Sequence, residues 1–284
     1  MDAPPSQENC VPFVQVAQLF KAAGVHVPEI LAQDLAQGLL LLSDLGSETY
    51  LAQLNANSAD DLYRDANNAL IKIQLASQPN QLPRYDAVHL LREMRLFSEW
   101  YITKHLQAVL STKQTEVLEN AWQQILSNVL TQPTVYVHRD YHSRNLMYAE
   151  PNPGVLDFQD AVLGPITYDL ASLYKDAYIA WEEERVIDWT IRYWEAAKRA
   201  QLPVGDDFGA FYRDFEWMGI QRHVKVLGIF ARLYHRDGKD GYLKDMPLVL
   251  DYLRKACSRY RALGPLLDVL DELHRREHQV GYTF

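Results

Sequence analysis

The chain has 284 residues, of which 48% are hydrophobic, and its formal net charge at pH 7 is −9. This length can bury one large core or two lobes. The acidic balance argues against nucleic acid and anionic membranes as partners, because phosphate groups are bound by clustered Lys and Arg.

The remaining composition predicts a reduced, cytoplasmic protein. The two cysteines, Cys10 and Cys257, lie far apart in the sequence and do not suggest a disulfide framework. The sequence contains no run of about 18 uncharged apolar residues, so no membrane span is predicted. The first five residues, M-D-A-P-P, lack the basic and apolar segments of a signal peptide.

The first fifty residues predict one short helix and two strands. Apolar residues at helical spacing extend over residues 11–23, and Gly24 closes this helix. A strand is predicted to start at residues 27–31, and the four leucines at residues 39–42 predict a buried strand. On the residues alone, the following segment 43–46 is equally consistent with a plain turn and with a functional loop.

Helices are predicted over most of residues 58–130. Ser58 is the expected N-cap of the first helix, which is followed by a Pro-containing linker at residues 79–83. A second amphipathic helix is predicted over residues 85–110. A third is predicted to begin with Thr112 as its cap and to run to about residue 130.

The most informative stretch is residues 134–160. A β-branched and aromatic run at its start predicts a buried strand, which delivers Asp140 into a loop. His138, Asp140 and Asn145 form the pattern H-x-D-x-x-x-x-N. A second strand and a Pro/Gly turn then reverse the chain, and this hairpin is predicted to bring Asp157 back beside Asn145.

This pattern matches the catalytic and metal-binding loops of protein-kinase-like phosphotransferases. In such a site Asp140 accepts the proton of the attacking hydroxyl, while Asn145 and Asp157 provide oxygen ligands for Mg²⁺. Simple turn capping is the alternative, and three polar positions on one strand, loop and hairpin disfavour it. A zinc pair of His138 and His142 is also disfavoured, because that motif requires a helix and a glutamate after the first histidine.

The rest of the chain is predicted to be helical. Asp169 follows a Gly-Pro turn and starts a helix, so we expect its carboxylate to hold the catalytic loop through backbone N–H groups. Further helices are predicted at residues 184–200, 208–235 and 244–263, with a terminal surface helix at residues 266–276.

One helical segment, residues 217–225, combines an indole, an amide, a guanidinium and an imidazole. Such donors suit the hydroxyl groups of a sugar. A solvated helix face is the alternative, and the residues alone leave both interpretations open.

Several motifs resemble one family over nearly the entire chain. The general pattern around Asp140 is shared by the aminoglycoside phosphotransferase and choline kinase family. The M-D-A-P-P start, the run N-P-G-V-L-D-F-Q-D-A and the segment Q-R-H resemble its bacterial N-acetylmuramate/N-acetylglucosamine kinase members, which phosphorylate the anomeric hydroxyl in peptidoglycan recycling.

This resemblance implies an α+β, protein-kinase-like fold with an incomplete, β-containing N-lobe and a mainly helical C-lobe. It implies ATP and Mg²⁺ as cofactors, an amino sugar as substrate, and a monomer. Asp140 would be the catalytic base, and Asn145 and Asp157 would hold Mg²⁺. ATP would lie against a hinge formed by Asp44, Leu45 and Gly46, and the candidates for substrate binding are Arg144, Gln221, Arg222 and His223.

The start of the chain departs from the family pattern. Only Gly24 and Gly38 occur among the first forty residues, so no glycine-rich phosphate loop is found, and Lys21 lies in a predicted helix rather than a strand. We therefore expect residues 1–50 to be a remnant of the N-lobe with the hinge, and residues 51–284 to form the C-lobe. The remaining strands of the N-lobe are expected to expose unpaired edges.

Three hypotheses of function follow. The leading one is an ATP-dependent kinase for the anomeric hydroxyl of N-acetylmuramate, N-acetylglucosamine or both. The second is an aminoglycoside or other small-molecule phosphotransferase, although Gln221-Arg222-His223 would bind a polycation poorly. The third is a catalytically impaired fragment that binds sugar or nucleotide.

Overall fold

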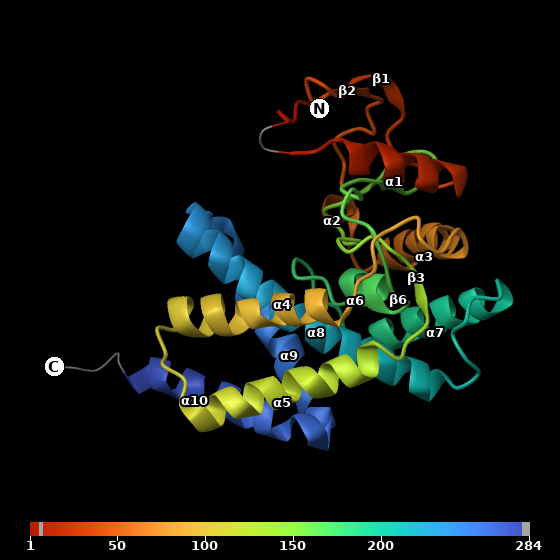
Figure 1. The fold of residues 1–284 in the computed structure, drawn as a ribbon. Helices are drawn as coiled ribbons and strands as arrows, with labels where there is room; N and C mark the ends of the chain where they lie inside the picture. The colour runs from red at the N-terminus through yellow and green to blue at the C-terminus, as the bar shows by residue number, and fades with distance from the viewer. Residues whose placement is uncertain (6–7, 280–284) are drawn as a thin grey trace. The chain divides into compact units, whose positions relative to one another are not determined.

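The computed structural model describes residues 1–5 and 8–279, with side chains to residue 274. It contains two compact units (Figure 1). The first comprises Met1–Arg84 and Pro133–Phe211, and the second comprises Tyr85–Gln132 and Tyr212–Phe284. The predicted lobe boundary at residue 50 remains a prediction.

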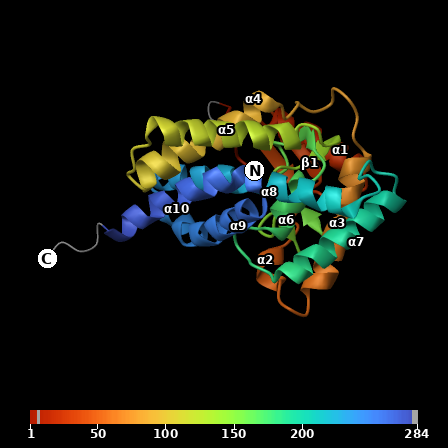
Figure 2. The same ribbon diagram turned by 90° about the horizontal axis from the view of Figure 1, so that it is seen from below.

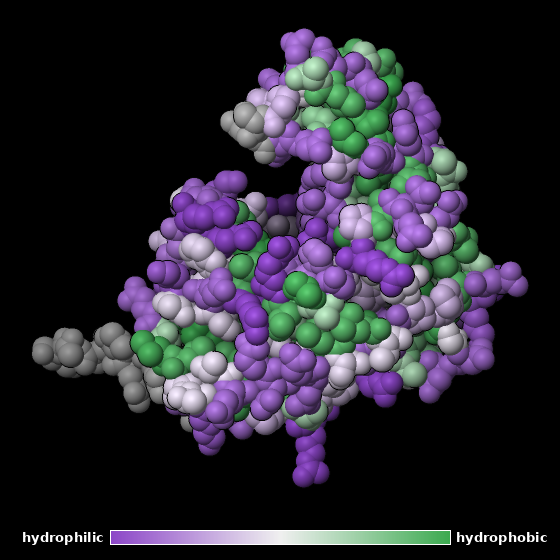
Figure 3. All heavy atoms as spheres, in the orientation of Figure 1, coloured by the Kyte–Doolittle hydropathy of each residue, from purple (hydrophilic) through white to green (hydrophobic). Residues whose placement is uncertain are grey.

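The first unit begins with helix α1 (Val11–Ala22) and the antiparallel strands β1 (Ile30–Asp34) and β2 (Leu39–Leu42), as predicted. The prediction that the four leucines form a buried strand is wrong, since only Leu40 is buried and Leu41 is 60% exposed. The two strands form a sheet of their own, so side chains of one face remain in solvent. Hydrophobic surface is visible over this part of the unit in Figure 3.

A short helix α2 (Tyr50–Gln53) leads into α3 (Ala59–Leu75), which buries an apolar face. Ser58 occupies the predicted N-cap position, but its side chain does not cap the helix. Its hydroxyl instead donates to the carbonyl of Gln53 at 2.8 Å and accepts from the N–H of Asn55 at 3.0 Å. The preceding turn therefore uses the group that the sequence suggested as a cap.

Four short strands form the central part of the first unit. Strand β3 (Thr134–Val137) pairs with β6 (Val162–Pro165), and β4 (Leu146–Met147) pairs with β5 (Gly154–Val155), both antiparallel. The expected Gly164-Pro165 turn is wrong, because both residues belong to β6. Pro165 is tolerated there because it is the last residue of a strand in a two-stranded sheet.

Helices α6 (Tyr168–Tyr174) and α7 (Glu183–Arg199) complete this unit, and α7 packs against α3. Helix α8 (Phe208–Asp237) begins in the first unit and continues in the second.

The second unit is helical in the described residues. It contains α4 (Ala87–Leu96), the π-helix η1 (Phe97–His105), α5 (Thr112–Val129), η2 (Asp240–Asp245), α9 (Met246–Arg259), η3 (Arg261–Leu263) and α10 (Gly264–Gln279). Helix α10 lies beside α5 and α9 (Figure 2). The expected terminal surface helix is confirmed: α10 buries Leu266, Leu270 and Leu273 on one face and leaves its other face exposed.

Two predicted helix ends in this unit are wrong. The helix predicted over residues 85–110 begins after Asp86, whose carboxylate accepts from the N–H of His89 at 3.0 Å, and it ends at His105. The left-handed backbone of Gln107 (φ 51°) prevents further helix. The cap of α5 is Ser111 rather than Thr112, because Ser111 and Gln114 form a reciprocal capping box.

In the part of the chain that the structure describes, no helix is long and apolar enough to cross a membrane.

Candidate active site

The hairpin of β4 and β5 brings Asp157 back beside Asn145, as the sequence predicted. Nδ2 of Asn145 lies 3.1 Å from Oδ2 of Asp157 and 3.0 Å from the backbone carbonyl oxygen of Asp140. One amide group thus links the loop of Asp140 to Asp157, the second residue after β5. The structure groups the three residues, and their individual roles remain predictions.

The donor atoms of this group fit a magnesium ion. The Asn145 amide nitrogen donates to both neighbours, which leaves its oxygen as an acceptor. Asp157 is exposed, and its carboxylate also accepts from Nε2 of Gln159 at 2.8 Å. Mg²⁺ is usually bound by one or two protein oxygens together with substrate phosphates, and Asn145 and Asp157 offer such oxygens.

His138 is a structural residue of the catalytic loop. Its Nε2 donates to the carbonyl of Leu156 at 2.8 Å, and its Nδ1 accepts from the N–H of Asp140 at 3.3 Å. Burial lowers the pKa of His138 from 6.5 to about 4, so the ring is neutral at pH 7. Since both ring nitrogens are occupied, His138 has no lone pair available for the zinc pair considered from the sequence.

Asp169 holds the loop in the predicted manner. It is fully buried in the first turn of α6, and its two carboxylate oxygens accept from the N–H groups of His138 at 2.7 Å and Arg139 at 3.0 Å. Arg139 has a φ of 77° and Asp157 one of 61°. Such left-handed conformations are costly for these residue types and often occur at functional sites.

A second carboxylate, Asp176, fixes the other part of the loop and was missed by the sequence analysis. Its Oδ2 accepts from the N–H of Ser143 at 3.0 Å and from the Ser143 hydroxyl at 2.5 Å. Its Oδ1 accepts from the N–H of Tyr178 at 3.1 Å. Asp176 belongs to an irregular segment after α6, so no periodic signal in the sequence could have indicated this contact.

Arg144, a predicted substrate residue, directly follows Ser143, which Asp176 fixes. Its guanidinium carbon is 3.6 Å from the ring centroid of Tyr178. Tyr178 also makes an edge contact with the ring of His142, at 5.4 Å between centroids. The segment 175–182 therefore covers one side of the catalytic loop with Asp176 and Tyr178.

The predicted hinge lies along the catalytic hairpin. The N–H of Tyr148 donates to the carbonyl of Glu48 at 2.8 Å. A Cβ atom at Gly154 would lie 2.9 Å from Cδ1 of Leu45, so this glycine permits the close approach. Asp44 accepts from the N–H of Gly46 at 2.8 Å, which fixes the turn. The structure brings Asp44, Leu45 and Gly46 to the hairpin, and their contact with ATP remains a prediction.

The other predicted substrate residues lie on α8 in the second unit. Gln221, Arg222 and His223 are all buried, so the alternative of a solvated helix face is wrong. The His223 ring stacks on Tyr252, with centroids 5.2 Å apart. Neither the amide oxygen nor the amide nitrogen of Gln221 has a hydrogen-bond partner among the described residues.

Comparison with solved structures defines the fold. A choline/ethanolamine kinase family protein from Mesorhizobium loti matches with a TM-score of 0.65 at 14% identity, over 92% of this chain and 84% of that chain. The streptomycin-ATP-APH(2'')-IIa ternary complex matches with a TM-score of 0.56 at 16% identity, over 86% of this chain and 82% of that chain. The predicted protein-kinase-like fold is thereby confirmed.

Comparison of sequences gives the family. The chain belongs to the phosphotransferase enzyme family (APH), which matches residues 1–208. A protein from Pseudomonas aeruginosa is 50% identical over 96% of this chain and 81% of its own length, and one from Pseudomonas putida is 49% identical over 96% and 80%. Both relatives are named N-acetylmuramate/N-acetylglucosamine kinase. The family resemblance seen in the sequence is confirmed.

Proposed function

We propose that this chain is an ATP-dependent sugar kinase that phosphorylates the anomeric hydroxyl of N-acetylmuramate, N-acetylglucosamine or both. The observation that carries this proposal is the grouping of Asp140, Asn145 and Asp157 by one amide group. The identity of about half of all residues with kinases of that name supports the choice of sugar. Peptidoglycan recycling is the corresponding role.

The chain's own residues provide the base and its placement. The Asp140 carboxylate accepts the proton of the sugar hydroxyl as the hydroxyl attacks the terminal phosphorus of ATP. Asp169 fixes the backbone before Asp140, and Asp176 fixes the backbone after it. Phosphoryl transfer depends mainly on positioning, so these two buried carboxylates serve the reaction by keeping the base in place.

Asn145 and Asp157 would hold Mg²⁺ through their side-chain oxygens. When bound, this ion neutralises the charge of the nucleotide phosphates. The segment of Asp44, Leu45 and Gly46, fixed against the hairpin, would contact the adenine. Gln221 is the best supported residue of its segment for a sugar contact, because a buried amide without a partner is costly unless a ligand satisfies it.

A kinase assay tests the proposal. The chain is incubated with ATP, Mg²⁺ and each of the two sugars, and phosphorus NMR identifies the position of the new phosphate. We expect phosphorylation at the anomeric oxygen, and a loss of at least 100-fold in kcat for Asp140→Asn. The variant Asp61→Asn removes an exposed carboxylate that pairs with its helix neighbour Arg64, and it should retain full activity.

The other outcomes separate the alternatives. Turnover of an aminoglycoside but of neither sugar would indicate an antibiotic kinase. Binding of sugar or nucleotide without turnover would indicate an impaired fragment. Retained turnover in Asp140→Asn would refute the assignment of the base.

A further inference from the structure

Arg144 provides a positive charge beside the catalytic loop. It is half-buried, and among the described residues no carboxylate lies within ion-pair distance of its guanidinium. By contrast, many Arg residues of this acidic chain pair with Asp or Glu, as Arg95, Arg185 and Arg259 do. A guanidinium that faces an aromatic ring and has no carboxylate within ion-pair distance is available for an anion.

The guanidinium is held in one orientation by a fixed aromatic ring. Tyr178, on which it stacks, lies between two anchors of segment 175–182. Asp176 is bound to Ser143 on one side, and Trp181 on the other side donates through Nε1 to the hydroxyl of Tyr63 at 2.8 Å. Stacking leaves the N–H edge of the guanidinium free to donate, which pre-organises it for a planar acceptor.

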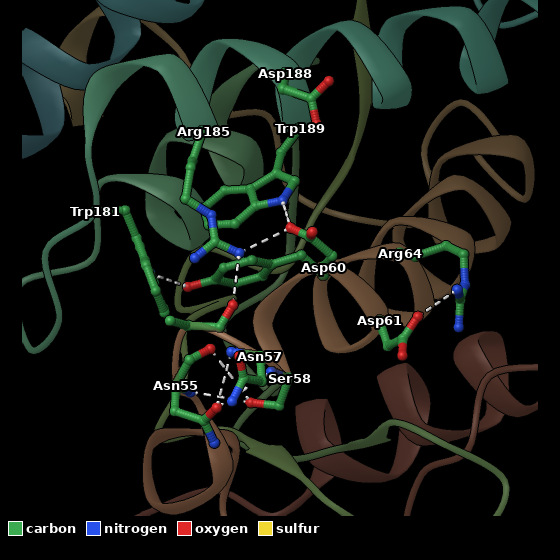
Figure 4. Close-up of polar contacts among 12 residues, drawn as sticks. Asn55, Asn57, Ser58, Asp60, Asp61, Arg64, Trp181, Arg185, Asp188 and Trp189 are labelled. Carbon is green, nitrogen blue, oxygen red and sulfur yellow. Dashed lines mark hydrogen bonds and ion pairs between the residues drawn. The ribbon is translucent and has the colours of Figure 1, made fainter.

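The anchor at Trp181 is itself part of a closed network (Figure 4). Arg185 stacks on the rings of Trp181 and Trp189, with 4.9 Å to each centroid. Asp60 accepts from both Arg185, at 2.9 Å, and Trp189, at 2.8 Å. The network fastens the end of the segment to α3, so the ring of Tyr178 is held by well-packed structure on this side.

Arg144 contacts a different part of the site from the expected magnesium ligands. The side chain of Asn145, its neighbour, turns to Asp157 of the hairpin, whereas the side chain of Arg144 turns to segment 175–182. This divergence favours an anion other than the nucleotide phosphates that are expected at Asn145 and Asp157. An anionic group of the acceptor is the remaining source.

We propose that Arg144, held by Tyr178, binds the carboxylate of an acidic acceptor sugar, namely the lactyl carboxylate of N-acetylmuramate. A planar carboxylate accepts two parallel hydrogen bonds from a guanidinium edge. N-acetylglucosamine has no such group, so Arg144 would set the preference between the two sugars. This inference rests on the proposed function and identifies the Arg144 guanidinium as the group that recognises the acidic substrate.

The test compares both sugars in wild-type protein and in Arg144→Gln, with ATP and Mg²⁺ saturating. We expect KM for N-acetylmuramate to rise by about 10- to 100-fold, which is the worth of a charge-assisted hydrogen bond. For N-acetylglucosamine, kcat and KM should stay within twofold. Arg144→Lys keeps the charge but not the planar fork and should be intermediate. Tyr178→Phe keeps the ring and should keep the preference, whereas Tyr178→Leu should weaken it.

Arg192→Gln is the matched control, because it removes an exposed guanidinium that pairs with Asp188 on the same helix. It should leave the sugar preference unchanged. Calorimetric titration of both sugars without nucleotide gives a readout independent of turnover, and only the affinity for N-acetylmuramate should fall in Arg144→Gln.

Three results are decisive against the inference. Equal losses with both sugars would place the guanidinium on the transferred phosphoryl group or in loop folding. Unchanged kinetics with N-acetylmuramate would show that Arg144 does not contact the carboxylate. If the wild-type protein neither binds nor phosphorylates either sugar, the proposed function fails and this inference fails with it, whereas the first two results leave the proposed function intact.

Discussion

The variant Asp169→Asn tests whether one buried carboxylate holds the catalytic loop. Each oxygen accepts one backbone N–H, at 2.7 Å and 3.0 Å. A hydrogen bond to a charged group contributes about 1.5–3 kcal/mol to stability. The amide of asparagine can replace one oxygen only, and its NH₂ group would face the second backbone N–H. We therefore expect a loss of about 2–4 kcal/mol in the free energy of unfolding.

Thermal unfolding and steady-state kinetics measure the two consequences. For a chain of this size, that loss corresponds to a decrease of roughly 5–15 °C in Tm. We expect kcat to fall by about tenfold or more, because Arg139 loses the contact that stabilises its left-handed backbone next to Asp140. Asp188→Asn, which removes an exposed carboxylate, should change Tm by about 1 °C or less. A Tm within 1 °C of wild type and an unchanged kcat for Asp169→Asn would refute the reasoning.

Three further predictions concern stability and reactivity. First, burial lowers the pKa of His138 to about 4, so below pH 6.5 the unfolded chain binds a proton that the folded chain does not. The free energy of unfolding should therefore fall as the pH falls from about 6.5 to about 4. Urea unfolding at several pH values should show a weaker dependence of this free energy on pH in His138→Asn than in wild type. Second, a Cβ atom at Gly228 would lie 2.5 Å from the carbonyl carbon of Leu96, so Gly228→Ala should lower the free energy of unfolding by about 1–3 kcal/mol. The control Gly264→Ala should not lower it, because a Cβ atom at Gly264 meets no atom within 4 Å. Third, burial raises the pKa of Cys257 to about 12, so iodoacetamide at pH 8 should alkylate this thiol only after the protein unfolds. Mass spectrometry measures the alkylation, and rapid labelling of the folded protein would contradict the burial of Cys257.

The grouping of Asp140, Asn145 and Asp157 was predictable because it depends on local structure. A strand, a loop and a hairpin of fixed length place the three residues within one short segment, and the turn residues of that segment can be read from the sequence. The role of Asp169 was predictable in kind, since a carboxylate at the start of a helix favours backbone N–H groups. The N–H groups that it contacts lie about thirty residues earlier in the chain, in the catalytic loop.

Burial was harder to predict than the type of element. Four consecutive leucines suggested a buried strand, but a two-stranded sheet places alternate side chains on two faces, and Leu41 is exposed. The polar segment of α8 shows the opposite case, since its Gln, Arg and His are buried, and the residues alone did not decide between a solvated face and a buried one. In both cases the outcome depends on which elements pack against a face, and hydrophobic pattern alone does not specify that.

Unlike Asp169, two other residues that fix the catalytic loop from outside its own segment could not be predicted. Asp176 and Tyr178 act from an irregular segment more than thirty residues after Asp140, and they meet Ser143 and Arg144 only because α6 and the Trp181 network fix that segment. Neither residue belongs to a recognisable spacing, so each looks like an ordinary loop residue in the sequence. The same packing gives Arg144 a fixed orientation. The motif alone suggested only a general role of Arg144 in substrate binding, whereas the proposal of a carboxylate ligand depends on this orientation.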